Sequence, residues 1–238
     1  SFVDKKKRYI SFWLDKACKN EGFKKFFFEK SNENLSENLS NYKFNTNNKF
    51  IITNEMFDVL SNSGLLIIED ALPVEEKNKV IDLFSELKNK NYSNQWKKKP
   101  TNILRNQTDL NIGMLEISKL SYLKHYSNQV TKKIFNKVVE PNVELHYLKL
   151  KNYSLESQDL KGETFLHSDR FLPHFKMFYT PFKINKDEAP FQYALGSHKI
   201  TDDYLDFFLN AKSFDETDFQ SKKLIKKIVN VVTNENTL

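Results

Sequence analysis

The sequence predicts an α+β fold in which helices come first and strands follow. Apolar residues recur at helical spacing in the first part of the chain, whereas from residue 143 they alternate with polar residues, as in half-buried strands. A hydrophobic content of 39% and an aromatic content of 14% are typical of a chain that folds around a core. This order of elements indicates an antiparallel barrel or sandwich in the C-terminal half.

The first part of the chain is expected to be mainly helical. Residues 2–30 place apolar residues at helical spacing between lysines, and residues 31–50, rich in Asn and Ser, predict a surface loop. The run LLIIE after Gly64 predicts a buried strand, and Pro73 is typical of the first turn of the helix that follows. A second long helix is predicted at about 115–138.

The second part is expected to be mainly β-structure. Alternating or aromatic-rich runs predict strands at 143–153, 174–182, 191–195 and 226–234. Residues 201–212 begin with a Thr-Asp cap and predict a helix among these strands. The NKDEAP segment between the second and third strands predicts a turn.

Composition argues against several classes of partner. With only five glycines and neither GxGxxG nor GxxxxGK[ST], a phosphate-cradling loop is not expected. The net charge is +6, but the lysine runs at 5–8, 97–99 and 222–227 are scattered among acidic residues, so we expect no nucleic-acid partner. No apolar run approaches the ~18–20 residues of a membrane span, and no signal peptide is visible. The single Cys18 excludes an internal disulfide and favours a cytoplasmic location.

His167 and Asp169 form a His-x-Asp pair with the composition of a metal site. On a strand, residues two positions apart point to the same side, so both side chains would project together. An imidazole nitrogen and a carboxylate oxygen suit a divalent first-row metal, and with a distant histidine they form the 2-His-1-carboxylate triad of non-haem Fe(II) oxygenases. Taken alone, such a pair is more often a solvated loop pair, and its context decides between the two interpretations.

The context is the stretch 165–199, which resembles the phytanoyl-CoA dioxygenase (PhyH-like) family of Fe(II)/2-oxoglutarate oxygenases. That family has a His-x-Asp, an aromatic-rich strand, an acidic turn, a Gly-Pro, an apolar strand and a Gly-Ser/Thr-His-Lys/Arg turn, and the same order is present here. The departure is Ala189, where the family usually has Gly before Pro190. The resemblance begins at about residue 63, and residues 1–50 match nothing in it.

The resemblance implies a double-stranded β-helix, a jelly-roll-like barrel whose mouth holds iron. We therefore expect two regions, an N-terminal helical extension and loop at 1–50 and a PhyH-like domain at 51–238. The implied cofactors are Fe(II) and 2-oxoglutarate, and the implied activity is hydroxylation of a small-molecule substrate with O₂. His167 and Asp169 match the first two metal ligands, and no catalytic residue beyond the ligands is expected.

Three further residues are expected near the cosubstrate pocket. Tyr179 matches a position that lines this pocket, and we expect the face of its strand to point inward, although plain aromatic core packing would have the same effect. Leu148 or Lys149, on the preceding strand, would border the same pocket. The sequence specifies no oligomeric state.

His198 is not expected to be the third ligand, because the Gly-Ser-His turn does not bind iron in the family. We expect His198 to form a hydrogen bond within that turn. His174 and His146 are expected to be structural, and His125 to lie on a helix surface.

In the family, the third ligand and an arginine for 2-oxoglutarate lie on later strands. This sequence ends at Leu238, where the first of these strands should begin. We therefore expect a piece of a longer protein that binds iron weakly and does not turn over 2-oxoglutarate. We also expect the 226–234 run to present apolar side chains at an open edge.

Two alternatives remain open. A non-catalytic jelly-roll binding module, or a pseudoenzyme of the same fold, would keep the barrel and lose the iron. A basic interaction protein would use the lysine runs instead.

Overall fold

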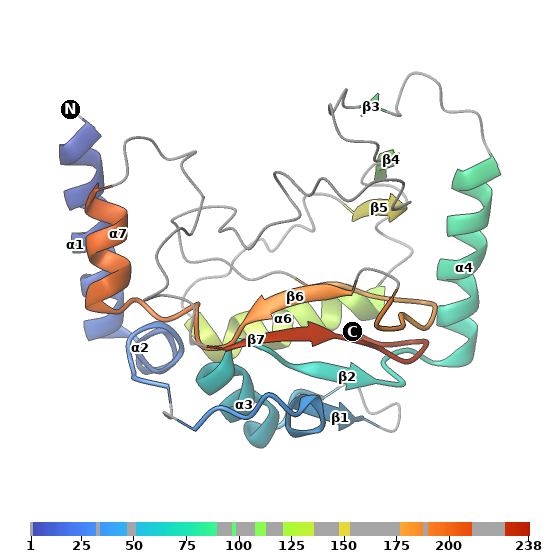
Figure 1. Ribbon diagram of the computed structural model, residues 1–238, viewed down its shortest axis with the longest axis horizontal. Helices are drawn as coiled ribbons and strands as arrows, with labels where there is room; N and C mark the ends of the chain where they lie inside the picture. The colour runs from blue at the N-terminus through green and yellow to red at the C-terminus, as the bar shows by residue number, and fades with distance from the viewer. Residues whose placement is uncertain are drawn as a thin grey trace.

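The protein combines helices with small β-sheets, as the computed structural model in Figure 1 shows. Helices α1 and α7 stand at one end of the view and α4 at the other, with the sheets of β1, β2, β6 and β7 between them (Figure 1). The structure describes residues 2–31, 34–46, 51–89, 97–98, 108–112, 121–135, 148–152, 177–187, 190–210 and 227–238.

The N-terminal region forms two helices, which confirms the helical prediction for residues 2–30. Helix α1 covers Phe2–Lys19 and α2 covers Glu21–Phe27. Asn20 separates them because its extended backbone ends α1, while its side chain accepts a hydrogen bond from the backbone N–H of Phe23 at 3.0 Å. This is the usual way for an Asn side chain to satisfy a free N–H at the start of a helix.

Helix α1 packs beside α7, which covers Asp202–Asn210 as predicted for the 201–212 run (Figure 1). The rings of Trp13 and Phe208 lie 5.1 Å apart, and both side chains are buried. The ammonium group of Lys6 is also buried and donates to the carbonyl oxygen of Leu209 at 2.9 Å. Carbonyls in the last turn of a helix lack an intrahelical partner, so Lys6 fixes the C-terminal end of α7 onto α1.

The surface loop predicted at 31–50 is wrong in part. A 3₁₀ helix covers Leu39–Tyr42, and strand β1 at Lys43–Asn45 pairs in parallel with β2 at Ile67–Glu69. The ring of Tyr42 is buried, so this segment contributes to the core. The Asn-rich composition gave no indication of a strand. Strand β1 is stabilised by its pairing with β2, which is distant in the sequence.

Helix α3 covers Asn54–Ser63 and was not predicted. Its ends carry clear signals: the Thr53 hydroxyl accepts a hydrogen bond from the N–H of Met56, and Gly64 ends the helix in the left-handed conformation with φ of 78°. A Thr cap and a terminal Gly are typical of helix boundaries. These two residues could have located the helix from the sequence.

Two longer helices agree with the predictions where they are described. Helix α4 covers Val74–Asn89 and begins directly after Pro73, with two glutamates in its first turn. Helix α6 covers Ser121–Phe135, within the range of 115–138 that was predicted. The strand β2 before α4 is buried, as the LLIIE run indicated.

Two of the predicted C-terminal strands form one antiparallel pair. Strand β6 covers Phe191–Ala194 and pairs with β7 at Ile228–Val231. Both lie inside the runs predicted as strands, at 191–195 and 226–234. The turn after β6 leads to α7, and β7 runs antiparallel beside β6 (Figure 1).

The last residues of the sequence are tied into the fold by backbone hydrogen bonds. Thr237 forms an antiparallel bridge with Thr180, at N–O distances of 2.8 and 3.1 Å. Leu238 exchanges two hydrogen bonds with Ile68 of β2, at 2.7 and 2.9 Å. The C-terminal segment therefore joins the 177–187 segment to β2.

The expectation of an apolar edge at the 226–234 run is wrong for its main members. Val229 is 3% exposed and Val231 is 8% exposed, and both pack against Tyr42 and Ile67. Only Ile228, at 41% exposed, presents much apolar surface. The strand alternates between the two faces, and its inward face meets the 3₁₀ helix and β2, two elements that the prediction did not place there.

A further sheet contains β3 at Lys97–Lys98, β4 at Thr108–Ile112 and β5 at Leu148–Asn152, in the order β3-β4-β5. All its pairs are antiparallel, and β5 lies within the strand predicted at 143–153. Together with the pairs β1-β2 and β6-β7, the strands of the described ranges form three small sheets. A closed double-stranded β-helix therefore stays a prediction.

The core joins the N-terminal helices to the rest of the chain. Its buried residues come from both sides of residue 50, so the helices before that position pack directly on the remainder. The largest cluster comprises Trp13, Ala17, Phe23, Phe26, Phe27, Ile52, Met56, Phe57, Leu60, Ile68, Ala71, Tyr126, Val130, Ile134, Ile200, Tyr204 and Phe208. Burying an aromatic or large aliphatic side chain contributes roughly 1.5–3 kcal/mol to the free energy of folding.

Among the described helices, none combines the length and the apolar character needed to cross a bilayer.

Candidate functional site

The two predicted metal ligands, His167 and Asp169, lie outside the residues that the structure describes. Leu148 and Lys149 are on β5, where their backbones pair with Ile112 and Asn111 of β4, but their side chains are also outside the described part. In the described ranges, no three His, Cys, Asp or Glu side chains gather in a way that could hold a metal ion. The metal site thus stays a prediction.

Tyr179 packs into the core, although its segment, residues 177–182, forms only an isolated bridge at Thr180 and not the strand predicted for 174–182. Tyr179 and Met177 pack against Leu72 and Val80, whereas Phe178 between them is 49% exposed. The alternation follows from the extended backbone, in which neighbouring side chains point to opposite faces. The ring of Tyr179 therefore forms part of an apolar wall beside α4.

The hydroxyl of Tyr179 donates a hydrogen bond to the side-chain oxygen of Asn236 at 2.9 Å. Burial raises the pKa of this phenol well above its ordinary value, and the nearby negative charge of Glu235 raises the pKa further. Tyr179 is therefore a neutral hydrogen-bond donor at every physiological pH. It can shape a pocket with its ring, but it cannot act as a base.

Asn236 is the centre of a buried polar network. Its side-chain oxygen also accepts from the N–H of Leu72 at 3.1 Å, and its side-chain nitrogen donates to the Leu72 carbonyl at 2.8 Å. Its own carbonyl accepts from the N–H of Ala71 at 2.9 Å, and its φ of 57° lies in the left-handed region that Asn tolerates. The Ala71 carbonyl accepts from Tyr126 of α6. This network connects Tyr179 to the segment between β2 and α4, to α6 and to the C-terminal segment.

His198 lies in the turn after β6 and is held against α3. Its Nε2 lies 3.0 Å from the carbonyl oxygen of Ser61, so this nitrogen carries the proton and donates it. The ring centroid lies 4.9 Å from that of Phe26. His198 is structural, as expected, but the expected partner is wrong: the hydrogen bond goes to helix α3 and not to its own turn.

The other ring nitrogen of His198 has no hydrogen-bond partner and is buried. Burial lowers the pKa of His198 to about 3, and the positive charge of Lys199 acts in the same direction. The imidazole is therefore neutral at physiological pH. The buried Oγ of Ser61 also lacks a hydrogen-bond partner, so the contact between α3 and the turn has two unsatisfied polar atoms.

Gly64 makes the close contact between α3 and this turn possible. A Cβ atom at Gly64 would lie 2.2 Å from the hydroxyl oxygen of Tyr193 and 2.4 Å from Nδ1 of His198. Burial raises the pKa of Tyr193 to about 12, against a smaller opposing effect of its hydrogen bond to Ser197. The phenol of Tyr193 and the imidazole of His198, both neutral, thus occupy the space that a side chain at position 64 would need.

Lys199 attaches the same turn to α2. It is 5% exposed, and its ammonium group donates to the carbonyl oxygen of Lys25 at 2.8 Å. Burial lowers the pKa of Lys199 to about 8. The next N–H, that of Ile200, donates to the carbonyl of Phe27 at 2.7 Å. The Gly-Ser-His-Lys turn is therefore a structural junction between β6, α2 and α3.

Three further histidines, His125, His146 and His174, were given predicted roles. His125 is exposed on α6, which confirms its predicted surface position. His146 and His174 lie outside the described residues, so their structural roles stay predictions.

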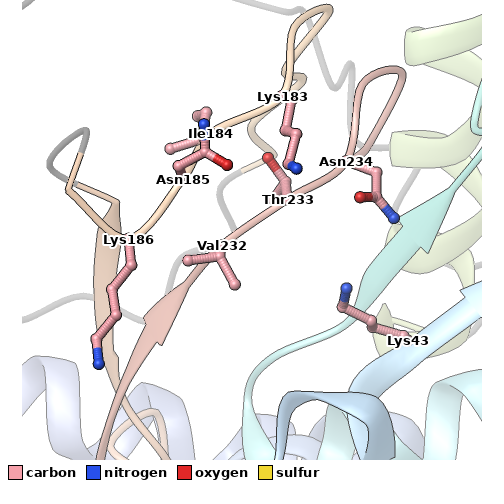
Figure 2. Close-up of a pocket in the computed structure, with 8 residues that line it drawn as sticks. All are labelled: Lys43, Lys183, Ile184, Asn185, Lys186, Val232, Thr233 and Asn234. Carbon is pink, nitrogen blue, oxygen red and sulfur yellow. The ribbon is translucent and has the colours of Figure 1, made fainter.

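A groove of about 200 Å³ was not predicted from the sequence. It lies between β1, the 183–186 segment and the start of the C-terminal segment (Figure 2). Its lining comprises Lys43, Lys183, Ile184, Asn185, Lys186, Val232, Thr233 and Asn234. The lysines come from segments about 140 residues apart, so no local pattern indicates that they share one groove.

Comparisons with known proteins give no relative for this chain: no protein-family model, no curated protein and no solved structure matches it. The fold and the described contacts define a protein of mixed helices and small sheets, with a groove lined by lysines.

Proposed function

We propose that the protein is an Fe(II)- and 2-oxoglutarate-dependent dioxygenase that hydroxylates a small molecule. The observation that carries the proposal is the order of features in residues 165–199. A His-x-Asp pair is followed by an aromatic strand, an acidic turn, an apolar strand and a Gly-Ser-His-Lys turn. Each feature is common by itself, but the complete order at this spacing is specific.

Three described features support the proposal without testing the metal site. Tyr179, at the position that lines the cosubstrate pocket in the family, faces inward. The apolar run before the Gly-Ser-His turn is strand β6, and its partner β7 is antiparallel to it. His198 is neutral and donates to Ser61, which agrees with a histidine that does not bind iron.

The side chains of His167 and Asp169 would hold the metal through one imidazole nitrogen and one carboxylate oxygen. This donor set suits Fe(II), which prefers mixed nitrogen and oxygen ligands. When bound, iron would supply the activation of O₂ that couples oxidative decarboxylation of 2-oxoglutarate to hydroxylation.

The contribution of the chain itself is position and exclusion of water. The ring of Tyr179, fixed through its hydroxyl to Asn236, would give the pocket a rigid apolar wall. Leu148 or Lys149 of β5 would border the same space. Fixed groups need no rearrangement when a substrate arrives, which is how a binding site gains affinity and precision.

The remaining parts of the proposal follow from composition. The substrate is a small molecule and O₂ the cosubstrate, with neither nucleic acid nor a membrane as partner. The single Cys18 fits a cytoplasmic location.

The decisive experiment is an activity assay on the whole gene product. In the presence of Fe(II) and O₂, this product should form succinate from 2-oxoglutarate. His167→Ala should abolish this activity, while His125→Ala, on the surface of α6, should leave it unchanged.

Absence of succinate formation would favour the non-catalytic binding module. Succinate formation that persists in His167→Ala would contradict the assignment of His167 as a metal ligand.

A further inference from the structure

We propose that the groove in Figure 2 binds an oxyanion, a phosphate or carboxylate group carried by a small molecule. This inference is independent of the proposed dioxygenase, because none of the lining residues belongs to the predicted metal or cosubstrate site. The proposal is based on the charge of the groove, the direction of its side chains, its hydrogen-bond donors and its fixed backbone.

Charge is the first argument. Three lysines line the groove, and no carboxylate is among the lining residues. Lys43 is paired with Glu69 outside the lining, at 2.8 Å. Lys183 and Lys186 have no ion pair or hydrogen bond within the described part of the chain. Because the side chain of Lys186 points away from the centre of the groove (Figure 2), the ammonium groups of Lys183 and Lys43 and the carboxylate of Glu69 leave a surplus of one positive charge, which an anion would neutralise.

The direction of the side chains is the second argument. Figure 2 shows Lys183, Thr233, Asn234 and Lys43 around one common space, while the side chain of Lys186 points away from it. Lys183 reaches this space from one wall and Lys43 from the opposite wall. An anion between them would contact two ammonium groups, and lysine is a common ligand of phosphate as a point charge.

Hydrogen-bond donors complete the polar part of the groove. The side-chain nitrogen of Asn234 donates to Glu69 at 2.9 Å, so Asn234 and Lys43 are joined through the same carboxylate. The hydroxyl of Thr233 lies 3.2 Å from that of Thr180, and Thr233 is 8% exposed. These bonds hold the polar groups in place, and a bound oxyanion would accept from the second N–H of Asn234 and from the remaining N–H bonds of Lys43.

The groove is also built on a fixed backbone. Ile184 and Thr233 form an antiparallel bridge with N–O distances of 3.0 and 3.2 Å. Ile184 and Val232 give the groove two apolar side chains next to its charged ones. This combination suits a small organic molecule that carries an oxyanion, because the apolar part and the charged part each find a complementary surface.

The test uses the 238-residue chain and inorganic phosphate. Amide resonances of residues 183–186 and 232–234 should shift in a saturable way in two-dimensional NMR spectra as phosphate is added. Raising the NaCl concentration should weaken binding, since partly exposed charges are screened by salt. Acetate, the carboxylate probe, should act on the same residues with lower affinity because it carries a single charge.

Variants separate this site from general attraction of a basic protein. Lys183→Gln should weaken phosphate binding by about tenfold, the loss of one charged contact of roughly 1.4 kcal/mol. Lys132→Gln, an exposed lysine of α6 outside the groove, removes the same charge and should leave binding unchanged. Because Lys183 is exposed, its variant should keep the wild-type circular dichroism spectrum and melting temperature.

Three results would overturn the proposal: no saturable shift in the wild-type protein, unchanged affinity in Lys183→Gln, or an equal loss in Lys132→Gln. His167→Ala should bind phosphate like the wild type. The outcome of the phosphate test therefore does not depend on whether the metal site exists. The outcome of a metal-binding test likewise does not depend on phosphate binding.

Discussion

His198 and Ser61 are joined by a hydrogen bond of 3.0 Å that connects the turn after β6 to helix α3. The two residues are 137 positions apart in the sequence. Because the imidazole is buried and neutral and lies beside the positive charge of Lys199, protonation would place an unfavourable charge inside the protein. The junction should therefore respond to pH.

The first prediction concerns stability in acid. The pKa of His198 is about 3 in the folded protein, against 6.5 for an ordinary histidine, so the unfolded chain binds more protons between these values. Stability is fully present above pH 6.5 and is lost as the pH falls through this window, by up to about 1.4 kcal/mol per pH unit. Urea unfolding at pH 7.5, 6 and 5 measures the slope, and His198→Gln should be less steep than the wild type. Equal slopes for both proteins would contradict this account of the junction.

The second prediction compares two glycines with the same backbone conformation. Gly64 and Gly196 have φ of 78° and 75°, so an alanine is strained at both positions, by about 1–2 kcal/mol. At Gly64 the new Cβ would also collide with Tyr193 and His198, whereas at Gly196 the nearest atom lies 3.1 Å away, on Ser31. Gly64→Ala should therefore lose about 1–3 kcal/mol more than Gly196→Ala in urea unfolding, through overpacking. Similar losses would mean that the close contact at Gly64 is not a constraint.

The third prediction concerns the network around Asn236. Tyr179→Phe removes one hydrogen bond and leaves the two bonds between Asn236 and Leu72 intact, so it should cost about 1 kcal/mol. Asn236→Gly keeps the left-handed backbone accessible but leaves three partner groups without a bond. It should cost at least twice as much as Tyr179→Phe. Thermal unfolding of the two variants measures both losses of stability. A smaller loss in Asn236→Gly than in Tyr179→Phe would show that the network contributes little to stability.

The sequence was informative where local patterns decide the structure. The Thr-Asp cap of α7, Pro73 before α4 and the aromatic run of β6 each predicted an element that is present. Alternation along the 174–182 run agrees with the packing of Tyr179 against the core and the exposure of Phe178, while the pocket role of Tyr179 stays a prediction. Each of these features is determined by residues that are close together in the sequence, so a local pattern can predict it.

Features that depend on distant partners were missed or placed wrongly. Strand β1 lies in an Asn-rich segment and exists through its pairing with β2. The partner of His198 was expected in its own turn, but it is Ser61 of α3, a helix that was not predicted. The groove brings Lys43 close to Lys183, and the spacing of residues along the chain contains no information about such a meeting.

The central claim is that His167 and Asp169 hold a metal ion, and Mn(II) binding followed by electron paramagnetic resonance tests it most directly. Mn(II) accepts the same nitrogen and oxygen ligands as Fe(II) and is stable in air. We predict one weak site in the 238-residue chain, lost in His167→Ala and in Asp169→Ala and retained in His198→Gln and His125→Ala. A wild-type protein that binds no more Mn(II) than His167→Ala, or a site that disappears in His198→Gln, would contradict the account.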